Sequence, residues 1–296
     1  MKVIVLGGTG LLGEALIQRC RSLGHEAVAA SRSSGTMPLD VADTRQLSDA
    51  IAAIRPDVVI NCAAITSIDA CEAQPGKAYV VNAAPVGELA RLSNDGRFKL
   101  VQVSTDHFFS GDGRARHDEN APVTLLNEYA KTKYAAESFA ALSPAALVVR
   151  TAFVGRGSRR DRGFAEHLHE ALLQARQLTL FQDAYTSLLH RSAVADLILQ
   201  LIERNASGVF NVASRDVFSK ADLIRAFADK LGLRLNARLG SVRSLKVVRA
   251  ESLGLATAKT ESVLGCRMPG FEETVARLAA DFSSLESVSE SAVSKQ

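Results

Sequence analysis

The sequence predicts an α/β protein in which a Rossmann-type doubly wound parallel sheet carries a smaller α/β substrate-binding lobe. Three observations support this fold class. Short β-branched runs alternate with helical stretches through the first half of the 296-residue chain. Most of these runs are apolar on both faces, which is typical of parallel strands that helices cover on each side. The first run leads through a glycine-rich turn directly into a helical stretch, as in a dinucleotide-binding unit.

The elements of the first half follow one another in strict alternation. The predicted strands are KVIVLG, EAVAAS, DVVINCAA, KLVQVSTD and ALVVR. The predicted helices lie between them, at residues 11–23, 43–54, 75–93 and 127–141. Because alternating strands and helices build a parallel sheet, we place a nucleotide-binding Rossmann domain at residues 1–150.

The pattern loosens after the fifth predicted strand. A basic, glycine-containing loop, GRGSRRDRG, precedes the next elements. Helices are predicted at residues 164–175, 192–204 and 219–231, with the short runs LTLF and GVFNVA between them. We assign residues 151–282 mainly to the substrate-binding lobe, with some segments returning to the first domain. Residues 283–296 are serine-rich and weakly apolar, and we expect a disordered tail there.

The composition limits the kinds of partner. The chain has 47% hydrophobic residues, 23% charged residues and a net charge of +3, values that favour a globular protein and indicate neither nucleic acid nor a membrane surface. No apolar run approaches the roughly 18 residues that span a bilayer, and the start of the chain lacks the features of a signal peptide. The four cysteines show no metal-binding spacing. We therefore expect a cytoplasmic protein with reduced thiols, no metal site and a small-molecule ligand.

The glycine-rich turn predicts a dinucleotide site. Gly7, Gly10 and Gly13 follow the first strand and open the first helix. Glycine permits the tight turn and lets the backbone approach a pyrophosphate, while the helix N-terminus offers unpaired N–H groups to its charge. We assign these glycines, with Leu11 and Leu12 between them, to cofactor binding. The alternative is a structural turn without a ligand.

The end of the second predicted strand favours NADP(H) over NAD. NAD-selective folds usually place an acid there to bond the ribose 2′-hydroxyl, whereas this chain has Ser31 and Arg32. A guanidinium presents a planar, permanently charged fork that suits a 2′-phosphate; alternatively, Arg32 is a solvated loop residue. Asp40 and Val41 are candidates for contact with the adenine, and Asp43 is suited to cap the following helix.

Tyr129 and Lys133 lie four residues apart in the predicted helix 127–141, so their side chains share one face. A neighbouring ammonium stabilises a phenolate and lowers the pKa of the phenol, which prepares it for proton transfer. Ser104 and Thr105 end a predicted strand, where a hydroxyl can donate to a developing alkoxide. Taken alone, this tyrosine and lysine would fit an ordinary surface helix equally well.

These motifs resemble the extended short-chain dehydrogenase/reductase family, and within it the dTDP-4-dehydrorhamnose reductase group of sugar-nucleotide reductases. The similarity covers nearly the whole chain. The matching pieces are GGTGLLG, DVVINCAAITSIDACE, VNAAPVGELA, VSTDHFFSGDG, NEYAKTK, VVRTAFVGRG, FQDAYTS and LGLATAKTESVLG. Such enzymes reduce the 4-keto group of a nucleotide-linked deoxysugar with a nicotinamide cofactor.

The resemblance implies a role for several residues. Tyr129 would be the proton donor, Lys133 would lower its pKa and hold the nicotinamide ribose, and Thr105 would donate to the substrate carbonyl. Asn82 matches a position that helps to order the site. The residues expected to line the cofactor after the third strand are Ala63, Ala64 and Thr66.

Several positions depart from the pattern of the group and leave the identity of the substrate open. His107 stands where tyrosine is common, and Phe153 stands where many members have tryptophan. We assign both to the substrate side, His107 as either an additional acid or a packing replacement for tyrosine. FQDAYTSLL lacks a usual proline, and Ala250 replaces another. In the basic loop, Arg159 and Arg160 are candidates for holding a substrate diphosphate, with a solvated surface as the alternative.

The sequence thus predicts NADPH-dependent reduction of the 4-keto group of a nucleotide-linked 4-keto-6-deoxysugar, with Tyr129 as the proton donor. An NADP-binding regulatory subunit without sugar reductase activity is one alternative. An NADPH-dependent reductase of a non-sugar carbonyl is the other. His107 stands in the place of the glutamate of related dehydratases, and no acid follows the second strand as in related epimerases, so both activities are disfavoured. The sugar, the product stereochemistry, a metal requirement and a homodimer are left open.

Overall fold

The computed structural model describes residues 1–32, 35–111, 113–157 and 163–293. Its main sheet has seven parallel strands in the order β11-β6-β5-β4-β1-β2-β3. The strands are β1 (Lys2–Leu6), β2 (Glu26–Ser31), β3 (Met37–Pro38), β4 (Val58–Asn61), β5 (Lys99–Val103), β6 (Leu147–Arg150) and β11 (Gly208–Asn211). The chain order reverses between β1 and β4, and ligands of such sheets bind outside the carboxyl ends of the strands at this point.

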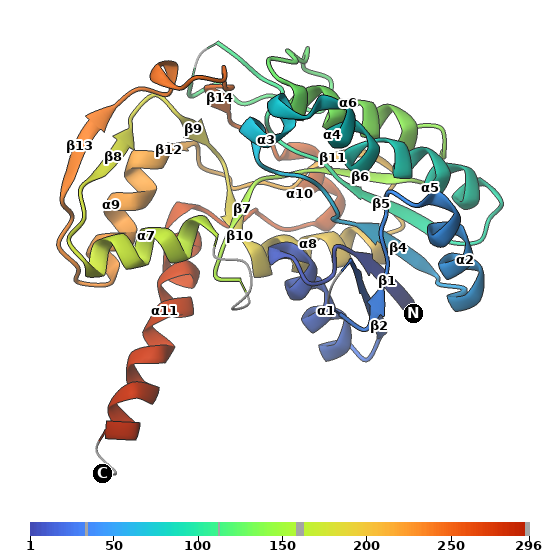
Figure 1. Ribbon diagram of the computed structural model, residues 1–296, viewed down its shortest axis with the longest axis horizontal. Coiled ribbons are helices and arrows are strands. Elements are labelled where there is room, and N and C mark those ends of the chain that lie inside the picture. The colour runs from blue at the N-terminus through green and yellow to red at the C-terminus, as the bar shows by residue number, and fades with distance from the viewer. Residues whose placement is uncertain (33–34, 112, 158–162, 294–296) are drawn as a thin grey trace.

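Helices cover both faces of the main sheet (Figure 1). One layer contains α1 (Leu11–Ser22), α8 (Arg191–Glu203) and α10 (Ala258–Leu264), and the other contains α2 (Thr44–Ile54), α5 (Ala84–Asn94) and α6 (Glu128–Ala140). Strand β1 shows why two layers are needed. Its side chains alternate between the faces, so Val3 and Val5 enter the first core while Ile4 and Leu6 enter the second. The doubly wound fold predicted from the sequence is confirmed.

The predicted helix 75–93 is divided in the structure. It forms α4 (Pro75–Asn82) and α5, and a further short helix, α3 (Ile68–Ala73), precedes them. Pro85 lies in the first turn of α5, where its missing N–H is tolerated, but it would clash with the preceding turn of a continuous helix. The chain therefore starts a new helix at this position.

The smaller lobe is built around α7 (Phe164–Leu173), α9 (Lys220–Lys230) and α11 (Phe271–Val293), whose apolar sides meet in one core. Three small sheets complete the region. They pair β8 (Leu178–Phe181) with β13 (Ala237–Gly240), β7 (Phe153–Val154) with β10 (Leu189–His190), and β9 (Tyr185–Thr186) with β12 (Phe218–Ser219) and β14 (Ser252–Leu253). A 3-10 turn covers Val242–Ser244. Between these elements, α8, β11 and α10 return to the main sheet.

The structure differs from the sequence-based expectation at the end of the chain. Helix α11 continues to Val293, and Figure 1 shows it extending away from the body of the protein. The expected disordered tail, residues 283–296, is thus largely helical here, and residues 294–296 lie outside the described part. The stretch 271–293 contains neither glycine nor proline, so nothing in its backbone ends the helix. None of the helices described is long and apolar enough to cross a membrane.

Candidate active site

A cavity of about 830 Å³ opens at the carboxyl ends of the central strands. The glycine-rich turn after β1 forms one wall, and residues that follow β4, β5 and β6 continue it. The catalytic candidates Thr105, Tyr129 and Lys133 all line this cavity, as do His107 and Phe153 on the expected substrate side. The cavity thus brings together predicted residues from five separate stretches of the chain.

The turn after β1 has a shape that only glycine permits. Gly7 has φ +72°, and a Cβ placed on it would lie 2.9 Å from the backbone nitrogen of Ala63. A Cβ on Gly13 would lie 2.2 Å from the carbonyl oxygen of Gly7. Gly10 is the N-cap of α1 and provides no side-chain cap. The first N–H groups of α1 are therefore accessible to an anion, and the backbone cradle fits a pyrophosphate.

Some of the cofactor residues predicted from the sequence line the cavity and others do not. Those that line it are Gly7, Gly10, Leu11, Leu12, Gly13, Ala64 and Thr66. Ala63 contacts the turn through its backbone rather than the cavity. Arg32 is exposed at the end of β2, beside residues outside the described part. Asp43 caps α2, accepting hydrogen bonds from the N–H groups of Arg45 and Gln46.

Asp40 and Val41 lie beyond the cavity wall. The carboxylate of Asp40 accepts a hydrogen bond from the N–H of Ala42 at 3.0 Å. Val41 is 7% exposed and belongs to the core beneath the sheet. Their predicted contact with the adenine stays a prediction.

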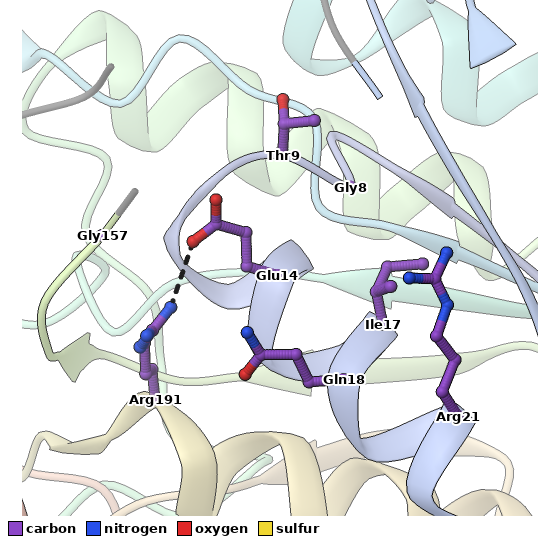
Figure 2. A pocket seen from close by; sticks show the side chains of 8 residues that line it. All are labelled: Gly8, Thr9, Glu14, Ile17, Gln18, Arg21, Gly157 and Arg191. Atoms are coloured by element: carbon purple, nitrogen blue, oxygen red, sulfur yellow. Dashed lines mark hydrogen bonds and ion pairs between the residues drawn. The ribbon is translucent and has the colours of Figure 1, made fainter. Parts of the chain in front are cut away.

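A second, open pocket of about 410 Å³ lies on the other side of the glycine-rich turn (Figure 2). The guanidinium of Arg191 points to Glu14 across it, and the two side chains form an ion pair at 3.3 Å. Arg191 also donates to the carbonyl oxygen of Leu11 at 3.2 Å. The start of α8 thereby fixes the first turn of α1, next to the backbone cradle that fits a pyrophosphate. Thr9 and Gly157 line both pockets.

Helix α6 presents Tyr129 and Lys133 on one face, as their spacing predicts. Asn127 caps the helix by accepting a hydrogen bond from the N–H of Ala130 at 2.9 Å. Its amide nitrogen also donates to the carbonyl oxygen of Val248 at 3.1 Å. Tyr129 is 8% exposed and Lys133 is 4% exposed. The interpretation of the pair as ordinary surface residues is therefore wrong.

The ammonium of Lys133 is held by the end of β5. It donates to the carbonyl oxygen of Val103 at 2.6 Å. Burial lowers the pKa of Lys133 to about 8, while the charges of Cys62 and Glu137 oppose this shift. Lys133 is thus both fixed in position and able to change its charge close to neutral pH.

The pKa of Tyr129 differs from the sequence-based expectation. Burial raises the pKa of Tyr129 to about 12, and a hydrogen bond with the Thr105 side chain acts in the lowering direction. The phenol packs in an apolar cluster with Ile68, Cys71 and Ala78. Lys133 instead directs its ammonium at the carbonyl of Val103. In this arrangement Tyr129 is a protonated phenol at neutral pH, which is the form that a proton donor requires.

The two hydroxyls at the end of β5 have different partners. Ser104 donates to Glu137 Oε1 at 2.6 Å, so its hydroxyl is already engaged in a buried hydrogen bond. Thr105 is 3% exposed, lies beside the phenol of Tyr129, and accepts a hydrogen bond from the N–H of His107 at 3.2 Å. Of the two candidates, Thr105 is the one beside the phenol.

Asp106 is a cavity residue that the sequence analysis did not assign. Its carboxyl group is 2% exposed and accepts a hydrogen bond from Thr105 Oγ1 at 3.4 Å. Burial raises the pKa of Asp106 to about 7, against the opposing charge of Lys220. Its position directly after Thr105, at the carboxyl end of a central strand, is the sequence signal that was available.

His107 packs against Tyr129 on the expected substrate side of the cavity. The two rings meet edge to face, with centroids 5.8 Å apart. Burial lowers the pKa of His107 to about 3, and the charges of Lys220 and Arg249 act in the same direction. Its Nδ1 is buried and has no hydrogen-bond partner among the described residues. The imidazole is therefore neutral, which favours its interpretation as a packing replacement over that of an additional acid.

Asn82 connects the turn after β4 to α6, which carries Tyr129 and Lys133. Its side chain is fully buried, accepts from the N–H of Ile65 at 2.7 Å, and donates to Thr132 Oγ1 at 3.1 Å. Because Thr132 precedes Lys133 on α6, this side chain fixes one wall of the cavity relative to the other.

Glu166 borders the cavity from α7. Its carboxylate accepts hydrogen bonds from the N–H groups of both Gly157 and Gly163.

The predicted substrate residues Arg159 and Arg160 lie outside the described residues. Arg156 faces elsewhere, because its N–H and its guanidinium both bond to Asp281 of α11. In the described part of the chain, no group of three or more histidine, cysteine, aspartate or glutamate side chains is arranged so that it could hold a metal ion.

Comparison with known proteins decides the family. The family model described as RmlD substrate binding domain matches residues 1–284. The chain belongs to this family. A curated relative named probable low-salt glycan biosynthesis reductase, from Haloferax volcanii, is 30% identical over 97% of this chain and 100% of its own length. A dTDP-4-dehydrorhamnose reductase from Mycolicibacterium smegmatis is also 30% identical, over 78% of this chain and 69% of its own.

Solved structures of the RmlD-like fold superpose closely on the chain. A dTDP-4-dehydrorhamnose reductase from Bacillus anthracis, in complex with NADP, has a TM-score of 0.85 at 24% identity and covers 94% of this chain and 98% of its own. A related structure from Clostridium acetobutylicum has a TM-score of 0.86 at 23% identity, covering 97% and 100%. These two structures agree with the fold, and the family model and the curated relatives confirm the similarity to this reductase group inferred from the motifs.

Proposed function

We propose that this protein reduces the 4-keto group of a nucleotide-linked 4-keto-6-deoxysugar with NADPH. The observation that carries the proposal is the convergence of Thr105, Tyr129 and Lys133 with the glycine-rich turn in one cavity. The relatives named as reductases of such sugars support the substrate class. The intact tyrosine, lysine and threonine argue against a purely regulatory subunit.

The residues around the turn fit a dinucleotide. The cradle of Gly7, Gly10 and Gly13 would hold the pyrophosphate at the start of α1. Ser31 and Arg32, with no acid at the end of β2, favour a 2′-phosphate and hence NADP(H) over NAD. When bound, the cofactor supplies the hydride. The B. anthracis structure with NADP supports this choice.

The side chains of this chain provide the remaining steps. Thr105 would donate a hydrogen bond to the carbonyl oxygen and polarise it. Tyr129 would give its phenolic proton to the same oxygen as negative charge develops there. Lys133, positively charged below about pH 8, would stabilise the phenolate left behind. His107, beside Tyr129, and Phe153 would contact the sugar.

The test is cofactor oxidation by the purified protein, followed at the nicotinamide absorbance. NADPH and NADH are compared on a small panel of nucleotide-4-keto-6-deoxysugars that a dehydratase generates in place. Turnover with NADPH on one sugar is expected, and Tyr129→Phe should retain NADPH binding and lose most turnover. Tight NADPH binding without turnover on any sugar would instead support the regulatory subunit or a non-sugar carbonyl substrate.

We place the reaction in the cytoplasm, where nucleotide sugars and NADPH are substrates of small soluble enzymes. Light scattering of the purified chain will decide between a monomer and a homodimer. Neither result alters the assignment of the cavity, because every residue used above comes from one chain.

A further inference from the structure

The carboxyl group of Asp106 lines the cavity, yet it is almost completely enclosed. Besides Thr105 on Oδ1, Thr186 of β9 donates to Oδ2 at 3.5 Å. Both hydroxyl partners are themselves buried, Thr105 being 3% and Thr186 1% exposed. Among the described residues, no lysine or arginine forms an ion pair with this carboxyl group. An enclosed carboxylate without a cationic partner is unfavourable, so these surroundings favour the protonated acid.

Thr105 joins this acid to the proposed proton donor. Its hydroxyl lies beside the phenol of Tyr129 on one side and donates to Asp106 Oδ1, at 3.4 Å, on the other. All three groups line the cavity, and each is at least nine-tenths buried. When Asp106 is protonated, the same pair of oxygens carries a hydrogen bond in the opposite direction, from the acid to Thr105.

We propose that Asp106 is the internal proton source that restores Tyr129 after each turnover, acting through the Thr105 hydroxyl. The inference rests on the proposed reduction. In each cycle, Tyr129 gives its proton to the substrate oxygen as the hydride adds to the carbonyl carbon. The Thr105 hydroxyl then passes its proton to the phenolate, and the Asp106 carboxyl passes its own to the Thr105 oxygen. The products are the alcohol and an Asp106 carboxylate, which takes a proton from water once the product leaves.

The groups that face Asp106 set its charge. His107, whose Nε2 lies 3.9 Å from Oδ1, is neutral and adds no charge. Lys220, the first residue of α9, acts on Asp106 from the smaller lobe, and Arg249 acts in turn on Lys220 and His107. Tyr129 on α6 is also within electrostatic reach. With the pKa of Asp106 raised by burial to about 7, a good share of the molecules holds this proton at neutral pH.

The first test is the pH profile of kcat for the wild type and Asp106→Asn. In the wild type, kcat should fall as the pH rises through about 7, because the acid form is lost. Asp106→Asn keeps the size and hydrogen-bonding capacity but cannot deliver a carboxyl proton. It should lose about 100-fold in kcat, the low end of general acid catalysis, and lose this limb, with KM and NADPH affinity unchanged.

Two further variants separate the relay from a structural role. Lys220→Met removes the charge that lowers the pKa of Asp106, and Thr186→Val removes a hydrogen bond that does the same. Both should move the limb of the kcat profile to higher pH. Asp183→Asn, whose carboxylate bonds to Ser241 and Val242 in the smaller lobe, is the matched control and should leave it in place. The relay would be overturned if the limb stayed at the same pH in Lys220→Met and Thr186→Val. Full activity in Asp106→Asn would overturn it as well.

An infrared titration tests the proton reservoir without any sugar substrate. The infrared difference spectrum between the wild type and Asp106→Asn, each saturated with NADP+, should show the band of a protonated carboxyl group. This band should disappear as the pH rises through about 7. A band that disappears near the ordinary value of 3.8 would overturn the relay whatever the substrate is. Absence of turnover on every sugar, with the band intact, would instead contradict the proposed reaction alone.

Discussion

The imidazole of His107 meets the ring of Tyr129 edge to face, with the ring planes at 84°. This contact fixes one side of the proposed proton donor. It also places the unpartnered Nδ1 of His107 inside the cavity wall rather than against solvent. A substrate hydroxyl that reached this nitrogen would satisfy a buried polar atom, which is a favourable exchange.

Replacement of His107 by phenylalanine therefore tests substrate binding rather than proton transfer. The ring contact is kept and the nitrogen is lost, so KM should rise roughly fivefold, as expected for one net hydrogen bond. Because the pKa of His107 is lowered to about 3, the imidazole is neutral from about pH 4 upward, and the kcat profile of His107→Phe should match the wild type there. Steady-state kinetics at several pH values is the measurement. Loss of a limb near the ordinary pKa of histidine would show that His107 acts as an acid.

The glycine-rich turn offers a second prediction. Gly13→Ala places a methyl group against the carbonyl oxygen of Gly7, and the strain should destabilise the fold by about 1–3 kcal/mol and weaken NADPH binding. Gly76→Ala is the control, because nothing lies within 4 Å of its added Cβ in α4. This change should stabilise the protein by up to about 1 kcal/mol. Thermal unfolding and NADPH titration of both variants decide the matter, and equal NADPH affinities would contradict the proposed cradle.

Much of the framework follows from local patterns. The strand runs, the turn at Gly7 and the spacing of Tyr129 and Lys133 are properties of short stretches, and each short stretch determines its own geometry. The parallel pairing of the strands then brings the ends of these stretches together at one edge of the sheet, and no additional sequence signal is needed for this. For this reason the geometry of the glycine-rich turn and the shared face of Tyr129 and Lys133 on α6 agree with the sequence-based expectation.

The surroundings of the ionisable side chains Tyr129 and Asp106 depend on residues that are distant in sequence. The raised pKa of Tyr129 reflects its enclosure, to which Val247 of the smaller lobe contributes. The second hydroxyl on Asp106 comes from Thr186, 80 residues away. Neither contact has a local signal, so the direction of the Tyr129 shift and the burial of Asp106 could not be predicted from the motifs that contain them.

Lys133 should make stability depend on pH in a defined window. Its pKa falls from the ordinary 10.5 to about 8 in the folded protein, so between these values the unfolded chain binds more protons. Stability from this group therefore rises with pH through the window, and the full penalty applies below about pH 8. Lys133→Met removes the effect. As the pH rises from 8 to 10, the melting temperature of the wild type should increase relative to that of the variant.

Lys131→Met provides the control for this measurement. Lys131 is exposed on the same helix, and its bond to Glu128 raises its pKa rather than lowering it. It should stay charged throughout the window, so the wild type and this variant should show parallel stability curves. Parallel curves for Lys133→Met as well would contradict the assigned burial of its ammonium.

Arg32 should decide between the two nicotinamide cofactors. A guanidinium that bonds a 2′-phosphate contributes an interaction that NADH cannot make, whereas the rest of the cradle serves both cofactors equally. Arg32→Ala should therefore weaken NADPH binding about 10- to 100-fold, the value of a hydrogen bond to a charged group, and leave NADH binding unchanged. Arg45→Ala, which changes an exposed arginine of α2, is the control for a general loss of positive charge. Equal losses for both cofactors in Arg32→Ala would place the 2′-phosphate elsewhere, because only a contact to that phosphate can distinguish NADPH from NADH.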